Sequence, residues 1–262
     1  MLGAIIGDLA GSIYEFDQIK QVKPIKMQHL IEENAFFSDD TILTVAVADA
    51  LLSGKDFETK IKEYAQKYHS YAPDFKPYFK TPFSPNFMVW ANGNERGTSA
   101  GNGAMMRVSP IGFWFETEED VKKYARLATE CSHDCEEAIK CAEIVAIIIF
   151  FARKGFSKEQ IKQKLNLKIK KPKIEKFNYL CAETLDVCLY SFFETNSFEN
   201  CIKTALSFGG DTDTNACISG SIAEAFYGID ENIKNQAKQK LSPNLLNVVE
   251  KFYQHVENRR KI

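Results

Sequence analysis

Two short acidic segments, far apart in the chain, hold the side chains best suited to chemistry. Residues 37–41 have the sequence FSDDT, and residues 209–214 have the sequence GGDTDT. Carboxylate and hydroxyl oxygens are the ligands that hard divalent cations such as Mg²⁺ and Mn²⁺ prefer in proteins. If the fold brings the two segments together, they predict a two-metal site of the kind that catalyses hydrolysis.

Helix capping is the simpler interpretation of both segments, because hydroxyls and acids are favoured at the first turn of a helix. One capping residue is enough for a helix, however. Each segment places two carboxylates close together, namely Asp39 with Asp40 and Asp211 with Asp213. Such pairs repel one another, and a bound dication would relieve the repulsion. The glycines at 209–210 also indicate backbone that lies close to another group.

A third segment, residues 96–107 with the sequence RGTSAGNGAMMR, is rich in glycine and short hydroxyl side chains. Such a loop leaves backbone N–H groups exposed, as phosphate binding requires, although a plain glycine-rich turn is an equal alternative. It is neither a Walker A loop nor a dinucleotide fingerprint. A fourth segment, residues 7–15 (GDLAGSIYE), has an acid at either end. His133 lies just before a predicted helix, where its ring could meet a ligand or cap the helix.

Helical periodicity dominates the elements that must position these residues. The predicted helices cover residues 41–52, 57–68, 118–129, 136–153, 181–193, 198–206, 214–227 and 245–256, and a capping box at 157–160 opens a shorter one. Strand alternation is scarce, so we expect one all-α domain over residues 1–262. Residues 20–37 and 71–110 look irregular, and loops this long in a compact domain are usually functional.

The composition excludes several classes of protein. The 262 residues are 45% hydrophobic and 26% charged, with a formal net charge of −2, which gives no footprint of a general nucleic-acid or membrane-surface binder. The longest apolar run, residues 144–152, is too short to cross a bilayer. No secretory signal is visible, and the seven cysteines form no CxxC pair, which favours reduced, packed thiols. We expect a cytoplasmic monomer without a membrane segment.

The four segments, taken in order, resemble the ADP-ribosylglycohydrolases, a family that includes the enzyme that reactivates ADP-ribosylated dinitrogenase reductase. The resemblance is carried by GDxxGxxxE at residues 7–15, SDDT at 38–41, GNGAxMR at 101–107 and GGDTDT at 209–214. It spans residues 3–228, and the last two motifs are the most specific. Ser38 stands where many members have threonine, so the hydroxyl is kept.

The resemblance implies an orthogonal helical bundle that holds two Mg²⁺ or Mn²⁺ ions and binds ADP-ribose. The implied metal ligands are Ser38, Asp39, Asp40, Asp211, Asp213 and Thr214. Glu15 matches the family's catalytic glutamate, and either Glu15 or Asp40 could accept a proton from the attacking water. The implied substrate-binding residues are Gly97, Thr98, Ser99, Gly101, Asn102 and Gly103 for the diphosphate and His133 for the ribose. The implied substrate is an ADP-ribosylated protein or another ADP-ribosylated acceptor, with ADP-ribose as the product.

Three other interpretations compete with hydrolysis of ADP-ribose linkages. A haloacid-dehalogenase phosphatase would need the DTD sequence at 211–213 to follow a buried strand. An HD-type phosphohydrolase would use His133 and Asp134 with a histidine such as His69, and it leaves the acidic segments unexplained. A family member that binds ADP-ribose or serves structurally, without turnover, stays open.

The ends of the substrate are harder to place. We expect Phe113, Trp114 or Tyr227 to stack on the adenine. The acceptor, the group that carries ADP-ribose, should face residues 71–95, whose sequence shows no recognisable pattern. Only family precedent favours arginine as the acceptor.

Overall fold

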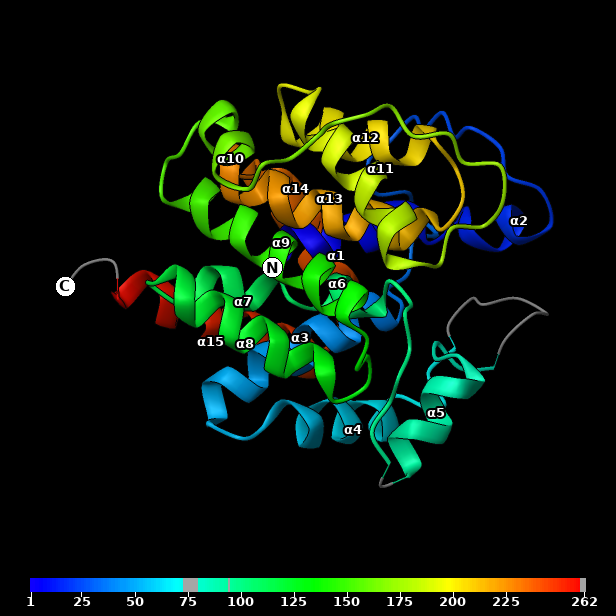
Figure 1. Ribbon diagram of the computed structural model, residues 1–262. Coiled ribbons are helices and arrows are strands. Elements are labelled where there is room, and N and C mark those ends of the chain that lie inside the picture. The colour runs from blue at the N-terminus through cyan, green and yellow to red at the C-terminus, as the bar shows by residue number, and fades with distance from the viewer. Residues whose placement is uncertain (73–79, 94, 260–262) are drawn as a thin grey trace.

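The computed structural model describes residues 1–72, 80–93 and 95–259. Within these residues the chain forms helices and loops without a β-strand, which confirms the all-α prediction (Figure 1). The helices are α1 Leu2–Gly11, α2 Glu15–Lys20, α3 Asp39–Ser53, α4 Phe57–Lys67, α5 Pro85–Asn92, α6 Gly103–Met106, α7 Ser109–Trp114, α8 Glu118–Glu130, α9 Glu136–Arg153, α10 Lys158–Lys164, α11 Cys181–Phe193, α12 Phe198–Ser207, α13 Thr212–Tyr227, α14 Glu231–Lys240 and α15 Pro243–Arg259. None of the helices in the described part of the chain has the length and apolar character that crossing a membrane requires.

The helices with strong periodicity and clear caps are confirmed. Helices α9 and α11 begin and end where predicted, and α10 opens with the expected capping box between Ser157 and Gln160. The prediction that residues 71–110 are irregular is wrong in part, because α5, α6 and the start of α7 lie there. Ser84 caps α5 through the N–H of Phe87, and Pro85 occupies its first turn. Residues 73–79 and 94 of that segment lie outside the described residues.

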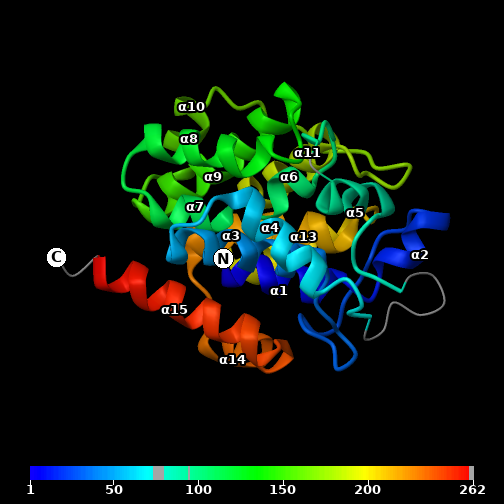
Figure 2. The ribbon, with the colours of Figure 1, turned by 90° about the horizontal axis from the view of Figure 1, so that it is seen from below.

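The N-terminal helix α1 was missed because it has no polar face. Every residue from Leu2 to Gly11 is buried, so the helix shows no amphipathic stripe. It lies against α13 at the centre of the molecule, as both ribbon views show (Figures 1 and 2). A Cβ atom at Gly7 would lie 2.0 Å from the Ala216 carbonyl oxygen, and one at Gly11 would lie 2.3 Å from the Asp213 Cα. The glycines therefore let the two helix backbones touch at the start of α13.

The remaining elements surround this central pair. Helix α3 packs against both α1 and α15, while α9, α11 and α12 pack against α13. Helices α2 and α5 lie on the same side of the bundle in both ribbon views. The acidic segments are therefore presented by two helix starts that pack on one central helix.

Candidate active site

The two acidic segments meet at the starts of α3 and α13. Ser38 is the N-cap of α3, and its Oγ accepts the N–H of Asp40 at 3.2 Å. The Thr214 hydroxyl, on the first turn of α13, donates to Oδ2 of Asp40 at 3.2 Å. Residues 174 positions apart in the chain are thus joined directly. The helix starts also direct their positive dipole ends toward the carboxylates.

Asp8 on α1 anchors the start of α3. Its Oδ2 accepts the backbone N–H of Ser38 at 2.9 Å, the N–H of Thr41 at 3.1 Å and the Thr41 hydroxyl at 2.5 Å. Burial raises the pKa of this carboxyl to about 7, and the charge of Asp213 adds to the effect. The sequence motif contains Asp8, but nothing in its spacing showed that it orients a neighbouring segment.

Asp211 is held from two sides. Its N–H donates to Oδ1 of Asn178 at 2.9 Å, and its Oδ2 accepts from Nδ2 of Asn102 at 2.7 Å. Gly210, just before it, has a φ of 78°, and a Cβ there would lie 2.0 Å from Oδ1 of Asn178. Only glycine suits this position. Asn178 is a supporting residue that sequence reasoning missed, because it lies alone in an irregular connector.

The carboxylates form one crowded cluster, in which Asp40, Asp211 and Asp213 are buried and Glu15 and Asp39 are half-buried. Carboxylate oxygens of Glu15, Asp211 and Asp213 lie within 4.8 Å of one another. Burial, and then the neighbouring negative charges, hold the pKa values of Glu15 and Asp213 well above their usual range. The same two causes raise the pKa values of Asp39 and Asp40, and one oxygen of Asp40, Oδ1, is buried without a hydrogen-bond partner among the described residues.

This arrangement fits a divalent cation. These carboxylates, some buried and some half-buried, repel one another, and a hydroxyl lies beside each pair. With one buried oxygen unsatisfied, they have the oxygen-rich donor set of a Mg²⁺ or Mn²⁺ site. A bound dication would also offset the charge that raises these pKa values. Glu15, predicted as a catalytic group, lies inside the same cluster.

The residues predicted to bind metal, the diphosphate and the ribose, together with Glu15, all line one cavity of about 690 Å³. The acidic cluster forms its floor, and residues 97–103 and His133 form one wall. Two predicted alternatives find no support here. His69 is exposed and contacts Thr81, not His133, and α12 rather than a strand precedes Asp211.

The glycine-rich segment is fixed on both sides. Thr98 forms an isolated bridge with His133, and Gly101 forms one with Leu180. Among residues 97–103, four N–H groups are bonded within the protein, those of Gly97, Ser99, Gly101 and Asn102, which donate to Cys131 O, Ser132 O, Ser99 Oγ and Tyr179 O. The segment therefore exposes fewer N–H groups than its glycines suggest, and the Thr98 and Ser99 hydroxyls become relatively more important.

The aromatic residues expected to stack on adenine lie elsewhere. Trp114 stacks on His255 at 4.2 Å, and the Tyr227 hydroxyl donates to the Thr195 carbonyl at 2.6 Å. Neither they nor Phe113 line the acidic cavity, because α7 and the end of α13 lie away from the start of α13. The cavity's aromatic residues are Phe16, Phe83, Phe87, Trp90 and Tyr179. Only the cap and proline before α5 could have indicated that part of this wall is helical.

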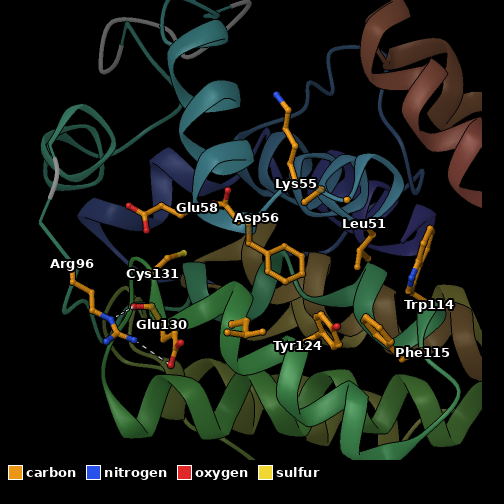
Figure 3. A pocket seen from close by; sticks show the side chains of 14 residues that line it. Leu51, Lys55, Asp56, Glu58, Arg96, Trp114, Phe115, Tyr124, Glu130 and Cys131 are labelled. Carbon is orange, nitrogen blue, oxygen red and sulfur yellow. Dashed lines mark hydrogen bonds and ion pairs between the residues drawn. The ribbon is translucent and has the colours of Figure 1, made fainter.

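A second cavity, of about 770 Å³, lies beside α3, α4 and α8 and contains Trp114 (Figure 3). Arg96, which we had placed in the diphosphate loop, lines this cavity and pairs with Glu130 and Asp134, each at 3.2 Å. Lys55 and Glu58 on its rim are also ion-paired. This cavity holds no cluster of carboxylates like that of the acidic cavity among the described residues, so we place the chemistry in the acidic cavity.

Comparison with known proteins agrees with this geometry. A family model described as ADP-ribosylglycohydrolase matches residues 1–261. The chain is 24% identical to the ADP-ribosylhydrolase ARH3 of Mus musculus, over 88% of this chain and 83% of that protein. It is 25% identical to the ADP-ribosylarginine hydrolase Tri1 of Pseudomonas putida, over 52% of this chain and 41% of that protein.

A solved structure shows the same fold. It is an "ADP-ribosylglycohydrolase-related protein complex" with a TM-score of 0.64 and 21% identity, and the match covers 97% of this chain and 96% of that one. The family model, which spans nearly the whole chain, decides the assignment: the chain belongs to the ADP-ribosylglycohydrolase family of enzymes.

Proposed function

We propose that this protein is a metal-dependent hydrolase that cleaves the glycosidic bond between ADP-ribose and a modified acceptor. The observation that carries the proposal is the junction of α3 and α13, where Thr214 donates to Asp40 beneath a cavity that also contains the glycine-rich segment. The names of the relatives support the class of bond, since both ARH3 and Tri1 are named as hydrolases of ADP-ribose linkages.

The donor set would hold two Mg²⁺ or Mn²⁺ ions. The proposed ligands are Ser38, Asp39, Asp40, Asp211, Asp213 and Thr214, all of which line the cavity. Bound there, such cations would supply Lewis-acid polarisation of the ribose oxygens and of the attacking water. The protein's own contribution is orientation: Asp8 fixes the start of α3, and Asn102 and Asn178 fix Asp211.

Proton transfer falls to the carboxylates around the reacting carbon. Hydrolysis adds the water oxygen to the ribose C1″ and moves one proton toward the departing acceptor. Glu15 or Asp40, both of which line the cavity, would take the proton from water. The oxocarbenium-like transition state is positive, so the remaining carboxylates stabilise it.

The wall of the cavity would bind ADP-ribose. The proposed diphosphate contacts are Gly97, Thr98, Ser99, Gly101, Asn102 and Gly103, and His133 is proposed to contact the ribose. Phe113, Trp114 and Tyr227 do not line this cavity. The aromatic groups that could stack on adenine are therefore the exposed ring of Tyr179 and the aromatic side chains of α5. Simple phosphate esters lack the ribosyl group and should not be hydrolysed.

The acceptor is the least determined part of the substrate. We place arginine first, because one bacterial relative is named as an ADP-ribosylarginine hydrolase. The assay is a panel of peptides that carry ADP-ribose on arginine or on serine, incubated with Mg²⁺ or with EDTA, with free ADP-ribose measured. Release that requires the metal supports the proposal, and release from serine alone would correct the acceptor only.

The same panel tests the non-catalytic alternative. A protein that binds ADP-ribose in calorimetry but releases none from any peptide would be a binding protein, and one that does neither would refute both proposals. Glu15→Gln serves as the matched control, because it should keep binding while losing release. The monomeric state, the cytoplasmic location and the single domain over residues 1–262 stay predictions; residues 73–79, 94 and 260–262 lie outside the described part of that range.

A further inference from the structure

Arg107, the last residue of the GNGAxMR motif, has an unusual environment. Its side chain is fully buried and lies beside the cavity. Only Nη2 has hydrogen-bond partners, the Ala128 carbonyl at 3.0 Å and Oγ of Ser132 at 2.6 Å, whereas Nε and Nη1 have none in the described part of the chain. Burying a guanidinium in which two of the three nitrogens lack a hydrogen-bond partner costs folding free energy. Its placement therefore calls for an explanation beyond packing.

The contact with Ser132 leads to His133. Oγ of Ser132 lies 2.7 Å from Nδ1 of His133. A guanidinium can only donate, so Ser132 accepts from Arg107 and has its own proton to offer to Nδ1. A neutral imidazole that accepts at Nδ1 carries its proton on Nε2. Arg107 thus favours, through Ser132, the Nε2–H tautomer of His133.

The proton on Nε2 faces the glycine-rich segment. A Cβ atom at Gly103 would lie 3.3 Å from Nε2, and one at Gly101 would lie 3.9 Å from it. All three residues line the acidic cavity. The backbone bridge between Thr98 and His133 keeps the histidine beside this segment. The absence of side chains at these two glycines leaves the Nε2 proton room to reach a ligand.

The electrostatic surroundings favour a neutral ring. Burial, and then the positive charge of Arg107, hold the pKa of His133 well below its usual range. Burial and the guanidinium together therefore keep the ring uncharged, and through Ser132 the guanidinium favours a proton on Nε2.

We propose that Arg107 and Ser132 are positioning residues that hold His133 as the Nε2–H tautomer, so that His133 donates a hydrogen bond to an oxygen of bound ADP-ribose. The donor role rests on the proposed function, whereas the tautomer is a property of the free protein. The arginine of the motif then acts through Ser132 and not as a direct phosphate ligand. A histidine in the opposite tautomer would present an acceptor to an electron-rich ligand and repel it.

The tautomer can be read directly in the ligand-free protein. Long-range ¹H–¹⁵N NMR spectra separate protonated from unprotonated ring nitrogens, and His133→Gln assigns the signal among the four histidines. We expect Nε2 protonated and Nδ1 unprotonated in the wild type, a mixture of tautomers in Ser132→Ala, and the wild-type pattern in Ser132→Thr. A wild-type ring protonated at Nδ1, or an unchanged ring in Ser132→Ala, would overturn the proposal. If Ser132→Ala does not fold, the wild-type spectrum decides.

Calorimetry with ADP-ribose tests the donor role. One lost or misdirected hydrogen bond should weaken binding by Ser132→Ala about five- to tenfold, and Ser132→Thr should restore it. A merely structural serine would lower the melting temperature without moving the tautomer. Unchanged affinity in a variant whose tautomer has shifted would overturn the donor role. A wild-type protein with the expected tautomer and no affinity for ADP-ribose would refute the proposed function and, with it, the donor role, while the positioning by Arg107 and Ser132 would stand.

Discussion

The floor and the rim of the acidic cavity are built in opposite ways. The floor is made by helix starts locked to α1, where Asp8 fixes α3 and Gly11 lets α13 touch the backbone. The rim is made by the turn before α5, by α5 itself and by Tyr179, whose side chain is 59% exposed. A rigid floor suits chemistry that must be placed accurately, and an exposed rim suits contact with a large, variable acceptor. We therefore propose that the floor cleaves the bond and that the rim binds the groups on either side of it, the adenine and the acceptor.

The largest effect should come from a carboxylate of the floor. Asp211→Asn removes a proposed metal ligand, and several kcal/mol of transition-state stabilisation correspond to a loss of about 10⁴-fold or more in kcat/KM. The metal-free variant should melt no lower than the wild type, because one negative charge is gone from a repulsive cluster. Rates and melting curves should be compared with those of Glu250→Gln, an exposed acid on α15. A variant with near-normal rates would show that the floor does not do the chemistry.

Glu15→Gln should rank second. It keeps the size of the side chain and removes its ability to move a proton, which for general acid–base groups costs roughly 10²–10⁴ in rate. Binding of ADP-ribose and the melting temperature should stay close to wild type. Asp17→Asn, an exposed acid on the same helix, is the matched control. Full activity of Glu15→Gln would assign proton transfer elsewhere, most directly to Asp40.

The stability of the floor should depend on pH and metal together. The pKa of Asp8 is raised to about 7, and the pKa values of Asp40 and Asp213 are also raised. These groups keep protons in the folded protein that the unfolded chain releases near pH 4, so their stabilising contribution is full below about pH 4 and is lost as the pH rises toward and beyond 7.

In EDTA, the melting temperature should therefore fall between pH 5.5 and pH 8, conditions chosen to lie on either side of the pKa of Asp8. Mn²⁺ should restore more stability at pH 8 than at pH 5.5, because the carboxylates must be deprotonated to bind it. Calorimetric melting curves at the two pH values, with and without Mn²⁺, make the measurement. A metal effect that is equal at both values would argue against a carboxylate site.

The smallest effect should come from the rim. Tyr179→Ala removes an exposed ring, and an aromatic contact is worth about 0.5–1.5 kcal/mol, which corresponds to a roughly two- to twelvefold rise in KM. The kcat should not change, because the floor is untouched, and Tyr179→Phe should behave as wild type. A fall in kcat with constant KM would contradict the claim that the rim contributes to binding and the floor to turnover.

The residues of the floor could be predicted from the sequence and those of the rim could not, for physical reasons. Paired acids with hydroxyls before a helix are unusual enough to mark Asp39, Asp40, Asp211 and Asp213, and all of them line the cavity. Asp8 and Asn178 act by contacts across the fold, and Ser132 accepts a hydrogen bond from Arg107, 25 positions earlier; such contacts leave no local pattern. The burial of α1 on all sides removed its periodicity.

The error over adenine has a similar cause. Trp114 and Tyr227 are prominent in the sequence, but an aromatic residue packs wherever the fold offers apolar contact. Trp114 packs against Phe252 and His255 of α15, and Tyr227 lies at the far end of α13 from the acidic cluster. Three of the aromatic residues that do line the cavity, Phe83, Phe87 and Trp90, come from a segment whose only local signal is the serine–proline pair at 84–85.

Counting bound Mn²⁺ tests the central claim most directly. Equilibrium dialysis should find two ions per wild-type chain, and anomalous diffraction should place them between α3 and α13, roughly 3.5–4 Å apart as in other two-metal hydrolases. Asp211→Asn should lose at least one ion, while Glu250→Gln should keep both. A wild-type chain that binds no Mn²⁺ at this cluster, yet still releases ADP-ribose in EDTA, would contradict the account.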